Sequence, residues 1–171
     1  VPRSLTDGKR SVKVEFAADG TGDAVGAVFG VWMRRALVID GSNPLVKTRY
    51  TADPAGYVDG DWFYVFMGHD DDKAKGYRMY DWSVVRTRDM ETWEDLGAVM
   101  SVRETFPWAK PEGAWASQAI RRDGKWYWYV AVFRKGGKTG VAVATADDVR
   151  GPWKDAVGGP LAEGNGFIDP S

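Results

Sequence analysis

Two Asp-Pro steps stand out as residues that could do chemistry. Asp53-Pro54 lies in the segment RYTADPAGYVDG, and Asp169-Pro170 lies in the closing segment FIDPS. Carboxylates that face one cavity can act as general acid and base, and a pair that flanks a sugar ring is what glycoside hydrolysis requires. The structural alternative is that each aspartate simply caps a turn before proline. The choice depends on whether the fold gives the two residues equivalent positions.

An internal repeat gives the two aspartates equivalent places. The segment DGDWFYV (59–65) matches DGKWYWYV (123–130), and SVVRTRDMETWEDLG (83–97) matches GVAVATADDVRGPWKDAVG (140–158). Each unit predicts a strand, an Asp-Gly hairpin, an aromatic strand, a long turn, and a strand with threonine that leads into an acidic turn. A third unit is expected to begin near residue 167, where FIDPS echoes YTADP. The repeat therefore favours the chemical interpretation of the Asp-Pro steps.

Strand signals dominate from residue 50 onward. Runs rich in β-branched and aromatic residues predict strands in 62–68, 77–89 and 139–148, and 115–133 predicts a strand, an Asp-Gly turn and a second strand. No segment in this part shows a helical period over about eleven residues. The predicted fold class is all-β.

The repeat unit also predicts the architecture. An antiparallel sheet of four strands in about sixty residues is the unit of a β-propeller blade. The smallest closed propellers have about four blades, whereas this chain supplies about two and the first strand of a third. The alternative is two β-sandwich sheets that happen to resemble each other.

The beginning of the chain is less readable. Residues 1–4 resemble the remnant of a protease-site tag. In the segment 5–42, SVKVEFAADG could form one strand, and VGAVFGVWMRRALVIDG could form a strand or a short helix. The partial propeller domain is expected over 43–171.

Composition excludes several classes of function. The net charge of −1 argues against a nucleic-acid partner, and no run is apolar and long enough for a membrane span. The chain has no cysteine, which leaves secreted, periplasmic and cytoplasmic locations open, and its one histidine, His69, argues against a histidine-based zinc site. Nine Trp, seven Tyr and seven Phe are typical of a β core or of a cleft for a carbohydrate or aromatic ligand.

Four segments together resemble glycoside hydrolase family 43, over about residues 43 to 171. They are YTADPAGYVDGDWFYVFMGHD, YDWSVVRTRDMETWEDLG, AWASQAIRRDGKWYWYV and GVAVATADDVRGPWKD. The resemblance implies a five-bladed β-propeller that acts on side chains or ends of xylan and arabinan. The combination of TADPA, GHD, DW and AWASQ is closest to the β-xylosidase and α-L-arabinofuranosidase branch. The implied partner is a xylo- or arabino-oligosaccharide.

The resemblance also implies catalytic roles. The family inverts the anomeric configuration; Asp53 matches the general base, and Asp169 matches the aspartate that orients the acid and raises its pKa. The general acid is a glutamate on a later blade that this sequence does not contain, and neither Glu112 nor Glu163 fits its motif. The chain alone is therefore expected to be weakly active or inactive.

No cofactor and no metal ligand are expected in this chain. Some family members hold calcium in the central channel through a histidine on a later blade, so calcium is compatible with the full-length fold. The acidic run HDDD (69–72) lacks the ligand spacing of an EF-hand and is interpreted as a solvated loop.

Further residues are candidates for the sugar pocket. Trp115 and Gln118 follow the inner strand of the second unit, and Trp82 is a second candidate wall. His69, in the motif GHD, is expected just after the second strand of the first unit, and Phe167 begins the motif FIDP. For Trp82 and Trp115 the alternative is packing between blades, and for His69 it is a surface or turn position. Four tryptophans that recur within the repeat are expected in the core: Trp62, Trp126, Trp128 and Trp153.

Two other function classes stay open at this point. A non-catalytic carbohydrate-binding or interaction module would keep the aromatic cleft without the acid, and a structural β-repeat protein would bind no sugar. An incomplete propeller exposes a blade face and unpaired strand edges, which predicts self-association or a complementing chain.

Overall fold

The computed structural model describes residues 37–134 and 136–171. The tag-like residues 1–4 and the predictions made for residues 5–36 lie outside this part. Within it, no helix is long and apolar enough to cross a membrane.

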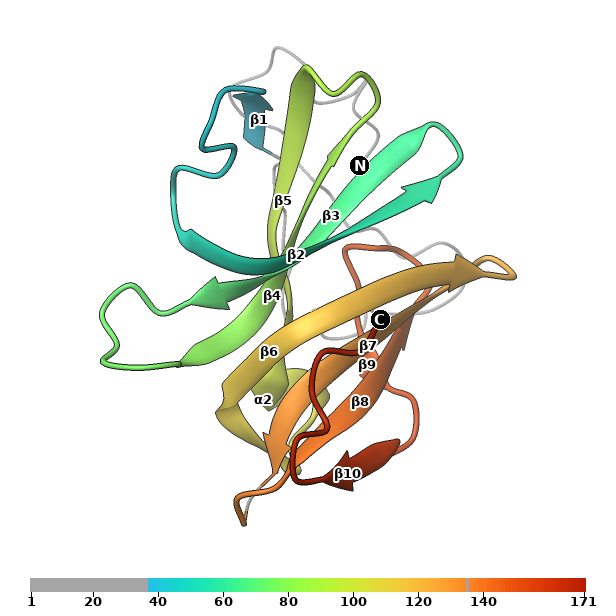
Figure 1. Cartoon of the computed structure of the whole chain (residues 1–171). Coiled ribbons are helices and arrows are strands. Elements are labelled where there is room, and N and C mark those ends of the chain that lie inside the picture. Colours follow the sequence, from blue (N-terminus) through green and yellow to red (C-terminus); the bar gives the residue numbers. More distant parts are fainter. Residues whose placement is uncertain (1–36, 135) are drawn as a thin grey trace, which may run out of the picture. The chain divides into compact units, whose positions relative to one another are not determined.

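The first repeat forms an antiparallel sheet (Figure 1). Four antiparallel strands, β2 to β5, pair in sequence order, and β1 pairs with β5, the last of them. The strands are β1 (Leu37–Asp40), β2 (Tyr50–Asp59), β3 (Trp62–Asp70), β4 (Met79–Thr87) and β5 (Thr92–Ser101). The sequence of residues 25–41 suggested either a strand or a short helix. The part of it that the structure describes contains the strand β1.

The second repeat forms a second antiparallel sheet with the same order. A one-turn helix, α2 (Val102–Thr105), connects the two sheets, and the Ser101 side chain caps it by accepting a hydrogen bond from the backbone N–H of Glu104. The strands are β6 (Ala109–Arg122), β7 (Lys125–Arg134), β8 (Thr139–Ala146), β9 (Lys154–Asp155) and β10 (Ala162–Gly164). Both β9 and β10 pair with β8, so they form one interrupted fourth strand.

The all-β prediction is confirmed, and so are the strands predicted between residues 62 and 148. β3, β4 and β8 fall on the predicted runs, and β6 and β7 form the predicted hairpin with Asp123 and Gly124 in its turn. Both turn residues have a positive φ, 51° and 79°, which is the conformation that favours Asp-Gly in a two-residue hairpin.

The predicted strand at 167–171 is not observed. This segment pairs with no strand among the described residues. β2 is extended because β3 returns along it, whereas FIDPS has no such neighbour in this part of the chain. An extended sequence pattern becomes a strand only where a partner satisfies its backbone groups.

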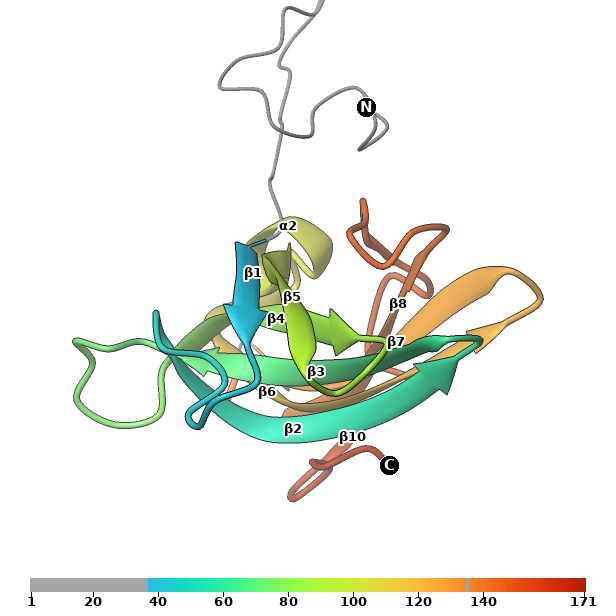
Figure 2. The ribbon, with the colours of Figure 1, turned by 90° about the horizontal axis from the view of Figure 1, so that it is seen from above.

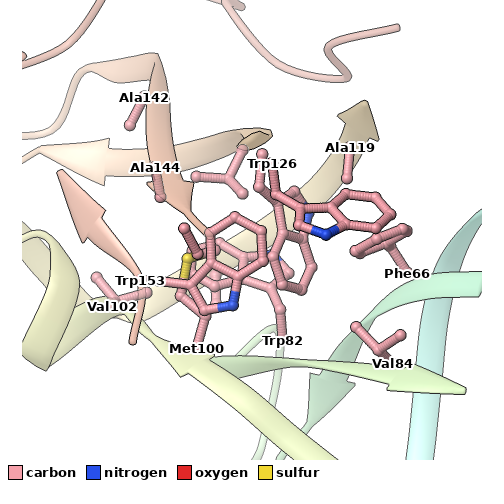
Figure 3. Close-up of a cluster of buried hydrophobic side chains, with 14 of the residues drawn as sticks. Phe66, Trp82, Val84, Met100, Val102, Ala119, Trp126, Ala142, Ala144 and Trp153 are labelled. Atoms are coloured by element: carbon pink, nitrogen blue, oxygen red, sulfur yellow. The ribbon is translucent and has the colours of Figure 1, made fainter. Parts of the chain in front are cut away.

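The main hydrophobic core draws on both sheets (Figure 3). Phe66 packs edge-on against Trp128 with 4.8 Å between ring centroids, and Trp128 packs likewise against Trp153 at 5.0 Å. Of the four tryptophans predicted in the core, Trp126, Trp128 and Trp153 are buried. Trp62 is half-buried and packs against the same cluster.

A smaller cluster covers the opposite side of the first sheet. Met67, Val85 and Trp93 are buried there, packed against Ile39 of β1 and against Leu45. Because apolar groups cover the sheet on both sides, β3 reads as a continuous apolar run, WFYVFM, and does not alternate with polar residues.

The first strands of the two repeats, β2 and β6, approach each other across the junction between the sheets (Figure 2). A single parallel bridge joins Met79 of β4 to Gly113 of β6. This arrangement brings the segment before the Asp-Gly hairpin of each repeat to the same junction, and the candidate site lies there.

Candidate active site

Asp53 lies in a β-bulge of β2. The pairing with β3 passes from Ala52–Gly68 to Ala55–Phe66, so β2 carries one extra residue at this point. Asp53 has φ 50°, in the left-handed region that aspartate tolerates better than most residues. Its side chain is exposed. Bulges re-aim side chains and are frequent next to active sites, so the local backbone presents this carboxylate outward.

Asp169 adopts the same backbone conformation. Its φ is 54°, it precedes a proline as Asp53 does, and it is exposed. Among the described residues other than glycine, a positive φ is found besides these two at Met90 and Asp123. The structure records no side-chain hydrogen bond or ion pair of Asp53 or Asp169 with another described residue. The similarity is therefore one of backbone geometry, not of contact.

Gly68 of β3 pairs with Ala52 next to the bulge, and it lies close to β2, β4 and β6. A methyl group built on Gly68 would lie 3.5 Å from Met79 Sδ, 3.6 Å from Ala114 O and 3.7 Å from Ala52 O. The backbone of β6 thus reaches the first sheet close to the Asp53 segment. All three distances are ordinary van der Waals contacts, so this position has room for a methyl group.

His69 is next to the same junction. It pairs with Thr51 of β2, two residues before Asp53, and so lies within β3 and not after it as the sequence suggested. Its Nδ1 is 2.9 Å from Oδ1 of Asp81 on β4, and the two side chains are 29% and 23% exposed. When Nδ1 carries a proton, Asp81 accepts it in a hydrogen bond and Nε2 is left for another partner.

The two candidate tryptophan walls differ in burial. Trp82 has no exposed surface, and its Nε1 donates a 2.7 Å hydrogen bond to the carbonyl of Trp115. This favours the packing alternative for Trp82. Trp115 is half-buried and packs edge-on against Phe133 at 4.1 Å, while its indole N–H is enclosed without a partner in the described part of the chain.

Gln118 and Phe167 are accessible but have no recorded contact with Asp53. Gln118 is half-buried on β6, and its Nε2 makes a long hydrogen bond of 3.4 Å to the carbonyl of Ala119. Phe167 is 46% exposed, and its ring lies over Gly164, where a built Cβ would meet it at 2.8 Å. The structure thus brings His69 close to Asp53 through its pairing with Thr51, whereas the Trp115 ring packs on Phe133 and the Phe167 ring packs on β10.

The surroundings of Glu163 favour its ionised form, whereas a general acid must hold its proton. It forms an ion pair with Arg134, and this hydrogen bond lowers the pKa of Glu163 below its usual value. A general acid near neutral pH needs a raised pKa, so the geometry supports leaving Glu163 out of that role.

The acidic loop after β3 is held by local backbone contacts. Asp71 accepts a hydrogen bond from the N–H of Lys73, and Asp72 accepts one from the N–H of Tyr50. In the part that the structure describes, no three His, Asp or Glu side chains come together in a way that could hold a metal ion.

Asp81 is the residue of this junction that sequence reasoning missed. It stands in the motif YDW next to Trp82, and only Trp82 was predicted to line the pocket. Its pairing with His69 depends on the register of β3 and β4, which includes a bulge between Gly68 and Asp70. No local signal in the sequence fixes that register.

Comparison with known proteins adds independent information. The family model "Glycosyl hydrolases family 43" matches residues 41–171. A xylosidase/arabinosidase 43A of Humicola insolens is 31% identical over 120 residues, which are 64% of this chain and 36% of that protein. An arabinoxylan arabinofuranohydrolase of Bacillus subtilis is 30% identical over 145 residues, which are 72% of this chain and 27% of that protein.

Solved structures of family 43 enzymes are also similar to this chain. An enzyme of Xanthomonas citri, complexed with xylose, superposes with a TM-score of 0.62 and 34% identity over 74% of this chain and 36% of its own. A β-xylosidase/α-arabinofuranosidase from a compost metagenome, in complex with xylotriose, has a TM-score of 0.64 and 28% identity over 72% of this chain and 39% of its own. The chain thus spans well under half the length of these relatives.

Proposed function

The chain belongs to glycoside hydrolase family 43, and from this we propose that it forms the Asp53–Asp169 part of an inverting glycosidase of the β-xylosidase or α-L-arabinofuranosidase type. One observation carries the proposal. Two exposed Asp-Pro aspartates share a left-handed backbone conformation at equivalent places of a repeat. Both aspartates precede a proline, which distinguishes them from Met90 and Asp123, the other residues besides glycine with a positive φ in the described part.

In this proposal Asp53 is the general base. Its carboxylate takes a proton from a water molecule, and the water attacks the anomeric carbon from the face opposite the leaving group. Inversion requires acid and base to stand roughly 6.5–9.5 Å apart, which leaves room for that water. The exposed position of Asp53 on a bulge is suited to hold such a water.

Asp169 is the proposed modulator of the acid. A carboxylate beside a protonated carboxyl group disfavours its ionisation and so raises its pKa. The acid itself is proposed to be a glutamate outside the 171 residues, on a blade that completes a five-bladed propeller with the two sheets seen here. Self-association or a complementing chain would pair the open strand edges. A second copy of these residues would not bring the acid, so the acid would come from a complementing chain or from another part of the protein.

The proposed substrate is a xylo- or arabino-oligosaccharide. Relatives have been solved with xylose and with xylotriose. Two residues of this chain support the proposal: His69 pairs with Thr51, two residues before Asp53, and Trp115 follows Ala114, whose carbonyl lies close to Gly68. An aromatic face packs on the C–H surface of a sugar, and an imidazole can exchange hydrogen bonds with its hydroxyls. No cofactor is part of the proposed reaction.

Assay of the purified chain on aryl β-xylosides and aryl α-L-arabinofuranosides tests the proposal for the isolated 171 residues. We expect little or no turnover, together with saturable binding of xylotriose. Turnover comparable with that of complete family members would contradict the assignment of the acid to another part of the protein. Absence of any sugar binding would contradict the function as a whole.

A carbohydrate-binding module is the second candidate. It is favoured for the chain by itself because Glu163, one of the two glutamates considered for the acid, is held in an ion pair with Arg134. A binding module needs neither Asp53 nor Asp169 as a carboxylate. Comparing xylotriose binding by the wild type and by Asp53→Asn therefore helps to separate the two functions, and a purely structural protein would bind sugar in neither form.

A further inference from the structure

Asn165 and Gly166 form the turn that follows β10. Both residues are exposed, and Gly166 has φ 82°, a left-handed conformation that glycine adopts without strain. The chain leaves β10 through this turn and runs on to Asp169 and the C-terminal end (Figure 1). The turn therefore sets the direction of residues 167–171.

The chain is fixed on the β10 side of this turn. Residues Ala162–Gly164 pair with β8, and the hydroxyl of Thr139 donates a 3.0 Å hydrogen bond to the carbonyl of Gly164. Beyond the turn, the Phe167 ring lies back against Gly164, where a built Cβ would meet it at 2.8 Å. A change of the backbone at the turn would therefore move residues 167–171 and leave the sheet in place.

The polar groups of the turn are free of other contacts in the described part of the chain. No hydrogen bond of the Asn165 side-chain amide, or of the Gly166 N–H, is recorded with another described residue. A Cβ built on Gly166 would meet no heavy atom within 4 Å, so the space beside this backbone is open. The short asparagine side chain keeps its carbonyl carbon within reach of the backbone that follows it.

This arrangement permits a reaction within the chain. The Gly166 nitrogen, after losing its proton to hydroxide, attacks the side-chain carbonyl carbon of Asn165. The new C–N bond closes a cyclic succinimide, and the side-chain nitrogen takes up a proton from solvent and leaves as ammonia. Water then opens the ring at the side-chain carbonyl to give aspartate, or at the main-chain carbonyl to give isoaspartate. The balance is one water consumed and one ammonia released.

The other asparagine of the chain cannot react by this route. Asn43 is followed by Pro44, whose nitrogen carries no hydrogen and is already fully substituted. Glycine, in contrast, keeps its N–H and has no Cβ that would hinder the attack. Asn43 is therefore an internal control for the reaction at Asn165.

We propose that Asn165-Gly166 is a site of spontaneous deamidation, and that the isoaspartate product redirects the segment that carries Asp169. Isoaspartate routes the main chain through its Cβ, so the turn becomes one atom longer, and either product adds a negative charge. The longer turn moves the Phe167 ring away from Gly164. Any effect on catalysis rests on the proposed function, because it takes Asp169 to act beside the acid, whereas the deamidation does not.

Peptide mapping by mass spectrometry of the whole 171-residue chain tests the site, with samples incubated folded and in urea. The peptide with Asn165 is expected to become heavier by the difference between a hydroxyl and an amino group, and to do so faster as the pH rises, because the attacking nitrogen must lose its proton. The peptide with Asn43 should keep its mass. Asn165→Gln, whose longer side chain would have to close a larger ring, should lose the modification.

A folded chain that keeps Asn165 intact while the chain in urea is converted would show that the turn protects the residue, and this would overturn the proposal. Equal conversion of Asn43 would overturn the mechanism. NMR tests the redirection, since the Phe167 ring shifts the signals of the Gly164 α-hydrogens. This shift should be lost in the isoaspartate form and kept in Asn165→Asp, which has the charge but not the extra main-chain atom. A shift kept in both forms would overturn the redirection.

Discussion

Arg121 of β6 donates a 2.6 Å hydrogen bond to Asp59 of β2, so the hairpin end of one repeat is bound to that of the other. The carbonyl of the same arginine accepts a 3.0 Å hydrogen bond from Tyr57. The two residues of this ion pair are 62 positions apart in the chain. The two repeats are thus joined by polar contacts at the hairpin end and by the Met79–Gly113 bridge between β4 and β6.

The first prediction concerns this ion pair. Asp59→Asn and Arg121→Gln should each lower the free energy of unfolding, and a double-mutant cycle should give a coupling energy of about 0.5–1 kcal/mol, since the pair is partly exposed. Urea unfolding of the four proteins measures it. A coupling energy indistinguishable from zero would show that this contact does not hold the repeats together.

The second prediction concerns pH. Asp95 receives two 2.8 Å hydrogen bonds from Arg49 and one of 2.8 Å from the N–H of Gly97. Burial by itself raises the pKa of Asp95, but these hydrogen bonds outweigh it and lower the pKa below its usual value. Because the folded pKa is depressed, the stabilisation is present above the usual value of about 3.9 and is lost as the pH falls below it.

Asp95→Asn should therefore lower the free energy of unfolding by about 3 kcal/mol at pH 7, because the arginine loses its buried partner. The difference between the two proteins should narrow as the pH falls from 5 to 3. Thermal unfolding across that range measures it, with Asp147→Asn, at a side chain that is 93% exposed, as the control. Parallel pH profiles would contradict the assigned role.

The third prediction concerns backbone packing beside the candidate site. A Cβ on Gly113 would lie 2.9 Å from the backbone N of Phe133, which cannot move aside without shifting β7. Gly113→Ala should lower the free energy of unfolding by about 1–3 kcal/mol. Gly159→Ala is the matched control, since no heavy atom lies within 4 Å of its built Cβ. Equal stability of the two variants would mean that the close approach is absent in solution.

Local signals were sufficient for much of the fold. The β6–β7 hairpin was predictable because an Asp-Gly pair between two apolar runs selects a tight turn. In the β2–β3 hairpin Asp59 pairs with Trp62, so the two turn residues are Gly60 and Asp61 and the Asp-Gly pair lies one position earlier than in β6–β7. The segment 167–171 has the sequence pattern of a strand, but it is not a strand in the described part, because no neighbouring strand pairs with it there. No local signal in the sequence predicts the interruption between β9 and β10.

The site was predictable in its residue types more than in its geometry. The repeat identified Asp53 and Asp169, but the bulge that turns Asp53 outward depends on the register of β2 against β3. Trp82 and Trp115 are chemically alike in sequence. Their burial differs because it depends on which face of each strand packs against the other sheet, and that is a property of the tertiary fold.

The most direct test of the central claim compares two ligands of the same shape but different charge. A glycosidase centre stabilises the positive charge that develops on the sugar ring, so its carboxylates should favour a cationic iminosugar of xylo configuration over xylose. Calorimetry of wild type, Asp53→Asn and Asp169→Asn gives the ratio of the two dissociation constants. Asparagine keeps the left-handed backbone, so the fold should persist. We expect wild type to prefer the iminosugar and both variants to lose that preference while still binding xylose; an equal ratio in all three proteins would contradict the proposed catalytic centre.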